Sequence, residues 1–159
     1  MDLSKALEVA MATHSGMVRT HNEDSIAADA ASGYVILADG MGGYNAGEVA
    51  SGITTATLGT TLAQALLTTD PGQIDPANGE PMAVKILKEQ IASANASIYQ
   101  EAKSQPQYAG MGTTLVAGLF YDNRVSVAHL GDSRLYRLRG DEFKQLTRDH
   151  SLLQEQIDS

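Results

Sequence analysis

The chain has 159 residues, about the size of one domain, and a net charge of −8, which argues against non-specific nucleic-acid binding because such binding needs a basic face. It contains no cysteine, which excludes disulfides, thiolate catalysis and zinc–cysteine sites. No apolar run reaches the ~18 residues of a membrane span, and the first residues lack a signal-peptide pattern, so we expect a cytoplasmic protein that does not enter a membrane.

The first part of the sequence predicts short strands joined by polar loops. Residues 9–13 are a modest strand candidate, and residues 18–24 are polar and predict a loop. Residues 25–30 predict a second short strand. The apolar run at residues 34–38 predicts a buried central strand.

Two helices are predicted in the middle of the chain. Residues 46–67 predict a long helix, although Gly52 and Gly59 either weaken this prediction or mark close packing against a sheet. Residues 68–81 contain three of the four prolines and predict a surface connection. Residues 82–103 predict the second helix, because apolar residues recur there at alternating spacings of three and four.

The remaining sequence predicts antiparallel strands. Residues 113–121 and 124–130 flank Asp122-Asn123, which is typical of a two-residue hairpin turn. Residues 134–138 and 143–146 flank a second predicted hairpin. Strands followed by two helices and then a run of strands indicate an α+β fold with antiparallel sheet.

Asp39 is the strongest candidate for a functional side chain. It directly follows the strand predicted at residues 34–38, and Gly40, Gly42 and Gly43 follow it. A carboxylate at the end of a strand provides an oxygen ligand for a hard metal ion, and glycines let backbone carbonyls approach closely. On the local sequence alone, Asp39 is equally suited to an Asx turn.

Three further segments contain residues typical of such a site: the arginine and two acids of residues 19–24, the glycines and threonines of residues 110–114, and the turn at residues 131–134. With the Asp39 segment they resemble the metal-dependent type 2C serine/threonine protein phosphatases in their compact bacterial form. The matching motifs occur in family order over nearly the whole chain: R-x-x-N-E-D at 19–24, D-G-M-G-G at 39–43, A-G-E-x-A-S at 46–51, G-T-T at 112–114, G-D-S-R at 131–134 and L-T-x-D-H-S at 146–151.

The resemblance implies a four-layer α-β-β-α sandwich of two antiparallel sheets flanked by helices, with two Mn²⁺ or Mg²⁺ ions at one edge. It implies that Asp39 bridges the two ions and that Gly40 provides a backbone carbonyl ligand. It also implies that Glu23 and Asp24 bind largely through metal-held waters and that Asp132 binds a third, weaker ion.

The same resemblance implies hydrolysis of phosphoserine and phosphothreonine in proteins by a metal-activated water, in opposition to serine/threonine kinases. Arg19 matches the arginine that holds the substrate phosphate, and a guanidinium can form a bidentate pair of hydrogen bonds that a lysine cannot match. Some family members carry histidine where this chain has Met41, so the proton for the leaving group is expected from a metal-held water or from His21.

Each of these residues also has a plainer structural interpretation. Arg19 could be a solvated arginine, and the acids Glu23, Asp24 and Asp132 could shape turns. Four other polar residues are predicted to have structural roles only. Thr113 and Thr114 are predicted to be strand residues, His129 a core histidine, and His150 a histidine that shapes its loop.

The family has two further metal-binding aspartates in segments downstream of the L-T-x-D-H-S motif, and this sequence ends before them. The helical pattern at residues 152–157 also stops one turn after it begins. We therefore expect residues 1–159 to be the N-terminal portion of a single catalytic domain, incomplete at its C-terminus, with weak metal binding, little activity and association through exposed sheet edges. The alternative is a non-catalytic regulatory or binding module that keeps the phosphatase fold. A calcium-binding module has no D-x-D-x-D-G loop to support it.

Overall fold

The structure is a computed structural model that describes residues 2–43 and 45–158. Its strands are β1 (Asp24–Asp29), β2 (Tyr34–Met41), β3 (Gly112–Thr113), β4 (Leu115–Tyr121), β5 (Arg124–Leu130), β6 (Tyr136–Arg139) and β7 (Glu142–Gln145). Its helices are α1 (Ala46–Thr68), α2 (Met82–Ser104), the short 3₁₀ helix η1 (Pro106–Tyr108) and α3 (Leu152–Asp158).

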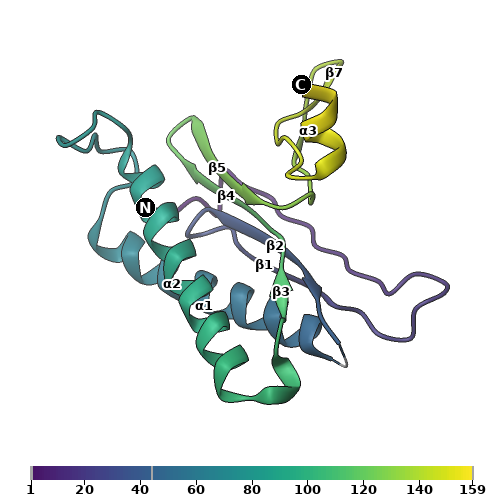
Figure 1. The fold of residues 1–159 in the computed structure, drawn as a ribbon. Coiled ribbons are helices and arrows are strands. Elements are labelled where there is room, and N and C mark those ends of the chain that lie inside the picture. The colour runs from purple at the N-terminus through teal and green to yellow at the C-terminus, as the bar shows by residue number, and fades with distance from the viewer. Residues whose placement is uncertain (1, 44, 159) are drawn as a thin grey trace.

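The strands form two antiparallel sheets. The larger sheet has five strands, in the order β1-β2-β4-β5, with the short β3 paired to the end of β2. The smaller sheet is the hairpin of β6 and β7, which lies with α3 near the C-terminus (Figure 1). The expected α+β class with two antiparallel sheets is therefore confirmed.

Helices α1 and α2 form one layer on a single face of the larger sheet. Helix α1 packs on β1 and β2, and α2 packs beside α1 (Figure 1). The predicted close packing holds for Gly59, where a Cβ would come within 3.2 Å of the Tyr34 hydroxyl, but Gly52 faces open space. No helix in the described parts of the chain is both long and apolar enough to cross a membrane.

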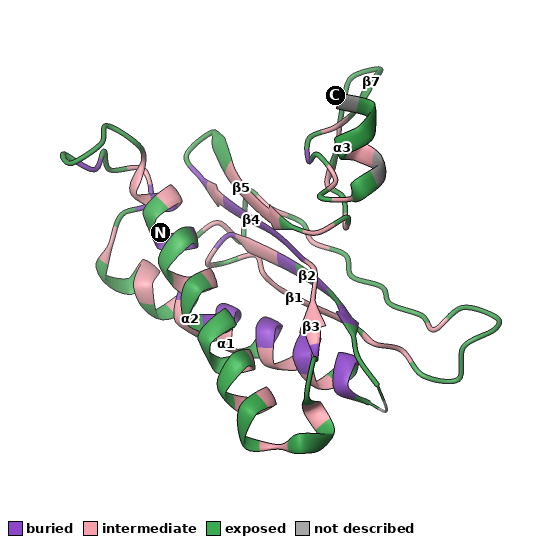
Figure 2. Ribbon diagram, viewed as in Figure 1, coloured by how far each residue is buried: buried purple, intermediate pink, exposed green. Residues whose placement is uncertain are grey.

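The main core lies between this helical layer and the sheet. Along β2 the side chains alternate, so that Ile36 and Ala38 are buried while Leu37 and Asp39 are exposed on the opposite face. Burial is concentrated where α1 meets the strands, whereas much of α2 and of the loop before β1 is exposed (Figure 2). The fully buried leucines each contribute roughly 1.5–3 kcal/mol by leaving water: Leu58, Leu62 and Leu119.

The strand predicted at residues 9–13 is wrong, because these residues form no strand. Residues 9–12 instead line an apolar hollow of about 310 Å³ over the sheet face opposite the helices, together with Val35, Leu37 and Val116. The apolar character of the segment was recognised correctly. However, a segment that lies on the face of a sheet has no backbone partner there with which to form a ladder.

Both predicted hairpins are present, and the second has shifted boundaries. Asp122 and Asn123 form the first turn, with Asp122 at a left-handed φ of 48°. In the second hairpin Arg139 pairs with Glu142, so the turn shortens to Gly140-Asp141. Gly140 has a φ of 56°, which a two-residue hairpin turn requires and glycine adopts without strain. Association of the chain through exposed sheet edges stays a prediction.

Candidate active site

Two carboxylates face each other where β1 begins and β2 ends. Asp24 pairs directly with Asp39 in the register of these strands. Although Asp39 is exposed as a residue, partial burial of its carboxyl raises the pKa of that group, and the charge of Asp24 and a hydrogen bond with it raise this pKa further. A native state that holds two carboxylates together in this way has a strong electrostatic preference for a cation.

Arg19 and Asp132 act on the same carboxylate from other parts of the chain. The positive charge of Arg19 lowers the pKa of Asp39, and the negative charge of Asp132 raises it. Arg19, Asp24 and Asp132 therefore all lie close enough to Asp39 to act on its carboxyl, although these four residues come from three separate segments of the sequence. The roles that the motifs imply for these residues stay predictions.

Glu23 and Gly40 are held together by close backbone packing. A Cβ at Gly40 would lie 1.9 Å from the Gly47 carbonyl oxygen and 2.8 Å from the Glu23 carbonyl oxygen. The Gly40 amide donates to that Glu23 oxygen at 3.0 Å, and the Ser51 hydroxyl donates to it at 2.6 Å. A Cβ at Gly47 would lie 2.6 Å from Glu23 Oε1, so the carboxylate lies against the first turn of α1, where the helix dipole favours negative charge.

Arg19, His21 and Glu23 line a surface hollow of about 500 Å³. His21 is exposed at this hollow, as expected for a loop histidine. Met41 is exposed at the end of β2 and has no proton to donate. The long loop that carries Arg19 and His21 projects beyond the sheet (Figure 1).

Asn22 and Ser51 are positioning residues to which sequence reasoning assigned no role. Asn22 accepts a hydrogen bond from the Asp24 amide at 3.1 Å and donates to Thr13 at 2.6 Å, which fixes the start of β1. Ser51 fixes the backbone of Glu23 from helix α1. Both residues lie inside the matched motifs. Their polar side chains, close in sequence to candidate ligands, were the signal from which a positioning role could have been inferred.

The prediction that Thr113 and Thr114 are only strand residues is incomplete. The Thr113 hydroxyl donates to the Asp39 carbonyl oxygen at 3.0 Å, and the Thr114 amide donates to it at 2.9 Å. The Asp39 amide donates to the Thr114 hydroxyl at 3.2 Å. The backbone on both sides of the candidate metal ligand is thus tied to the residues that connect β3 and β4.

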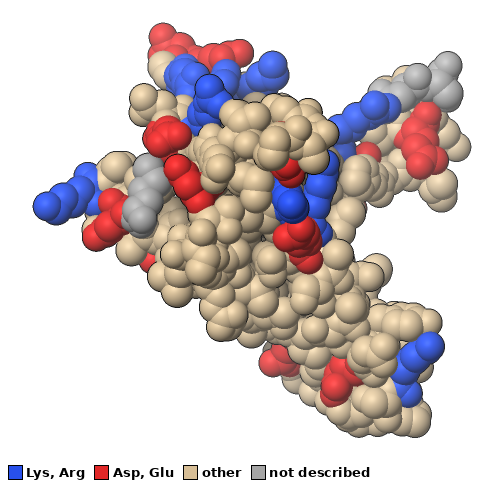
Figure 3. Space-filling view, turned by 90° about the vertical axis from the view of Figure 1, so that its left-hand side faces the viewer, with Lys and Arg blue, Asp and Glu red and all other residues tan. Residues whose placement is uncertain are grey.

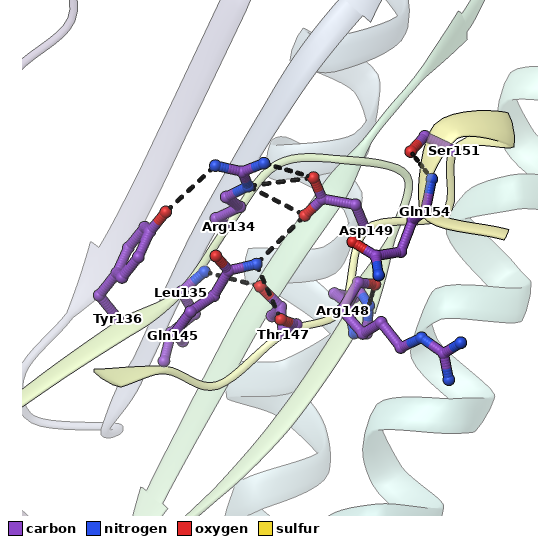
Figure 4. Close-up of polar contacts among 10 residues, drawn as sticks. Arg134, Leu135, Tyr136, Gln145, Thr147, Arg148, Asp149, Ser151 and Gln154 are labelled. Carbon is purple, nitrogen blue, oxygen red and sulfur yellow. Dashed lines mark hydrogen bonds and ion pairs between the residues drawn. The ribbon is translucent and has the colours of Figure 1, made fainter. Parts of the chain in front are cut away.

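The turn that carries Asp132 is fastened to the segment just before α3. Arg134 forms a bidentate ion pair with Asp149, with Nε 2.9 Å from Oδ1 and Nη2 2.6 Å from Oδ2 (Figure 4). This contact holds the pKa of Asp149 below its usual value and that of Arg134 above it. Gln145 also donates to Asp149 at 3.2 Å (Figure 4).

The two histidines near this turn differ from the prediction. His150 shapes the distant turn rather than only its own loop, because its amide donates to the Gly131 carbonyl oxygen at 2.9 Å and its Nδ1 accepts from the Gly131 amide at 3.3 Å. His129 is satisfied, with Nε2 2.7 Å from the Arg148 carbonyl oxygen, but it is only half-buried. Its ring lies 4.6 Å from that of His150.

The family model for protein phosphatase 2C matches residues 13–156. The chain belongs to the protein phosphatase 2C family. This match covers most of the sequence and includes every segment that contributes to the candidate site.

Named relatives of this phosphatase 2C chain are bacterial enzymes. It is 40% identical to the serine/threonine protein phosphatase PstP of Mycobacterium tuberculosis over 96% of this chain and 27% of PstP. It is 36% identical to the protein phosphatase PhpP of Streptococcus pneumoniae over 94% of this chain and 57% of PhpP. The chain therefore spans about half or less of the length of these curated relatives.

Solved phosphatase 2C structures share the fold. Stp1 from Staphylococcus aureus superposes with a TM-score of 0.78 at 32% identity, over 99% of this chain and 59% of Stp1. The catalytic domain of PstP in complex with two manganese ions superposes with a TM-score of 0.75 at 38% identity, over 90% of this chain and 56% of that one.

The donors of this phosphatase 2C chain suit a hard divalent cation. The candidate ligands are carboxylates and a backbone carbonyl, which Mg²⁺ and Mn²⁺ prefer. Within residues 2–43 and 45–158, no three His, Cys, Asp or Glu side chains come close enough to hold an ion by themselves. A divalent cation at Asp39 would relieve the repulsion from the neighbouring carboxylates, and water and backbone oxygen would have to provide much of its coordination.

Proposed function

We propose that residues 1–159 are the N-terminal portion of a single catalytic domain that hydrolyses phosphoserine and phosphothreonine in proteins. The observation that carries this proposal is the direct pairing of Asp24 with Asp39 across β1 and β2, with Arg19 and Asp132 close enough to act on the Asp39 carboxyl. Two bound Mn²⁺ or Mg²⁺ ions would polarise the phosphate and lower the pKa of a shared water towards about 7.

In this proposal each acid has a separate task. Asp39 and the Gly40 carbonyl oxygen would hold the two ions directly. Glu23 and Asp24 would hold them largely through waters, and Asp132 would hold a third, weaker ion. The support is the pairing of Asp24 with Asp39, together with a pKa of Asp39 that partial burial and then Asp24 raise, because a bound cation would neutralise such a pair of carboxylates.

Arg19 holds the substrate phosphate. Its guanidinium is close enough to Asp39 to lower the pKa of that carboxyl, and it lines the same hollow as His21. A guanidinium can donate two parallel hydrogen bonds to phosphate oxygens, which fixes the phosphate relative to the acids. The leaving group takes its proton from an ordered water or from His21.

The chain spans about half or less of the length of its relatives, and this fraction determines how much activity we expect from it. We propose that these residues alone bind metal weakly and turn over little, and that the whole protein is active against the targets of a serine/threonine kinase. The alternative is a regulatory module that keeps the fold without turnover.

Acidic and basic side chains intermix on the face drawn in Figure 3, which suits a protein substrate better than a polyanion. The cytoplasm stays the predicted compartment.

The direct test measures Mn²⁺-dependent hydrolysis of para-nitrophenyl phosphate and of a phosphothreonine peptide. Two proteins are compared: this chain, and this chain extended by the corresponding C-terminal part of PstP. We expect activity in the extended protein that disappears when a chelator removes the metal. Metal binding without turnover in the extended protein would favour the regulatory module.

Replacing Arg19 with alanine in the extended protein should raise KM about 10- to 100-fold, because a charge-assisted hydrogen bond contributes about 1.5–3 kcal/mol. Steady-state kinetics with the phosphothreonine peptide measures this change. Arg124→Ala, which removes an exposed arginine at the start of β5, is the matched control and should leave KM unchanged. A fall in kcat at constant KM would contradict the proposed role in holding the phosphate.

A further inference from the structure

Thr114 connects the backbone of Asp39 to the turn that carries Asp132. Its hydroxyl accepts from the Asp39 amide at 3.2 Å and shares a hydrogen bond of 2.6 Å with the Ser133 hydroxyl. Ser133 directly follows Asp132. One threonine side chain therefore joins two candidate metal-binding segments that lie more than 90 positions apart in the sequence.

The packing around Thr114 is close as well as polar. A Cβ at Gly131 would lie 2.8 Å from the Thr114 Cγ2 atom, so only a glycine lets the turn approach this far. Gly131 also has a φ of 92°, which glycine adopts without strain. The two hydrogen bonds between His150 and Gly131 hold the turn from its other side.

The hydrogen bond between Thr114 and Ser133 acts against an electrostatic repulsion. Asp132 and Asp39 are both acidic side chains, and like charges on segments joined through Thr114 repel each other. Asp132 is exposed in a turn that could relax away from β2 to relieve that repulsion. The hydrogen bond between Thr114 and Ser133 opposes this movement before any cation is bound.

We propose that Thr114 and Ser133 are positioning residues that fix the separation of Asp39 and Asp132, and thereby couple the paired-ion site to the third-ion site. This inference rests on the proposed function. Residues that orient metal ligands from behind typically change metal affinity about 10- to 100-fold when they are replaced.

The first test needs no metal. Thr114→Val keeps the shape of the side chain but removes the acceptor of the Asp39 amide, so hydrogen exchange at that amide should become at least about tenfold faster. The Gly40 amide, which donates to Glu23, is the internal control and should keep its rate. Thr114→Ser retains the hydroxyl and should restore slow exchange at Asp39. An unchanged exchange rate in Thr114→Val would overturn the proposal.

The second test measures Mn²⁺ binding by calorimetry in the C-terminally extended protein. Thr114→Val and Ser133→Ala should each weaken binding about 10- to 100-fold, and the double variant should be no weaker than the weaker single variant, because both remove the same link. Additive losses would contradict a shared link. If Thr114→Val fails to fold, Ser133→Ala removes the hydrogen bond between Thr114 and Ser133 by changing its other partner.

Asp39→Asn separates this inference from the proposed function. Mn²⁺ binding that survives Asp39→Asn unchanged would overturn the proposed function itself. Binding that Asp39→Asn abolishes, while Thr114→Val and Ser133→Ala bind as the unaltered chain does, would overturn only the positioning role.

Discussion

Asp39→Asn is expected to reduce Mn²⁺-dependent phosphatase activity of the C-terminally extended protein at least about 1,000-fold. Several kcal/mol of transition-state stabilisation depend on the two ions, and each 1.36 kcal/mol corresponds to about a factor of ten in rate. Asparagine keeps the size of the side chain but removes the negative charge that we propose holds both ions. Steady-state hydrolysis of para-nitrophenyl phosphate at saturating Mn²⁺ measures the loss.

The same substitution should stabilise the metal-free protein. Burial and the neighbouring acids raise the pKa of Asp39 in the native state, so the native state loses stability relative to the unfolded state as pH rises through the unfolded pKa of about 3.9. Asp39→Asn removes this penalty, and we expect a Tm about 2 °C higher at pH 7 and no gain below about pH 3.

The control for both effects is Asp141→Asn, which removes an exposed carboxylate from the turn between β6 and β7. It should change neither Tm nor activity. Near-complete activity of Asp39→Asn, or a lower Tm without metal, would contradict the assignment of Asp39 as a carboxylate held ready for a cation.

Gly40→Ala should be the most destabilising single-methyl substitution near the site. The new Cβ would lie 1.9 Å from the Gly47 carbonyl oxygen, so β2 and α1 must separate or Glu23 must move. Overpacking against backbone costs about 3 kcal/mol or more, which lowers Tm by about 6–12 °C in a protein of this size. Thermal unfolding followed by circular dichroism measures the change.

Gly43→Ala is the matched control, because it adds the same methyl group within the same motif. A Cβ at Gly43 would have no neighbour within 4 Å, so its Tm should stay within about 2 °C of that of the unaltered chain. Similar losses in the two variants would show that the Gly40 contact does not limit the packing of α1 against β2.

Features that depend on near neighbours in the sequence were predicted well. The apolar run of β2, the spacing of apolar residues in α2 and the turn at Asp122-Asn123 are each decided within a few residues. The strand predicted to be buried is buried on one face only, because Leu37 is exposed on the other. The second hairpin needed only a short correction, since Gly140 adopts the left-handed conformation that shortens its turn.

The order of the amino acids specifies which chemical groups this phosphatase 2C chain has for a site: carboxylates, one arginine and glycines that allow close approach. The folded chain adds the hydrogen bonds of Thr114 with Asp39 and of Arg134 with Asp149, and it places residues 9–12 over a sheet face without making them a strand. These contacts could not be predicted because the packing of distant segments selects each hydrogen-bond partner. Local propensity fixes the helices and turns, but it carries no information about which turn meets which strand.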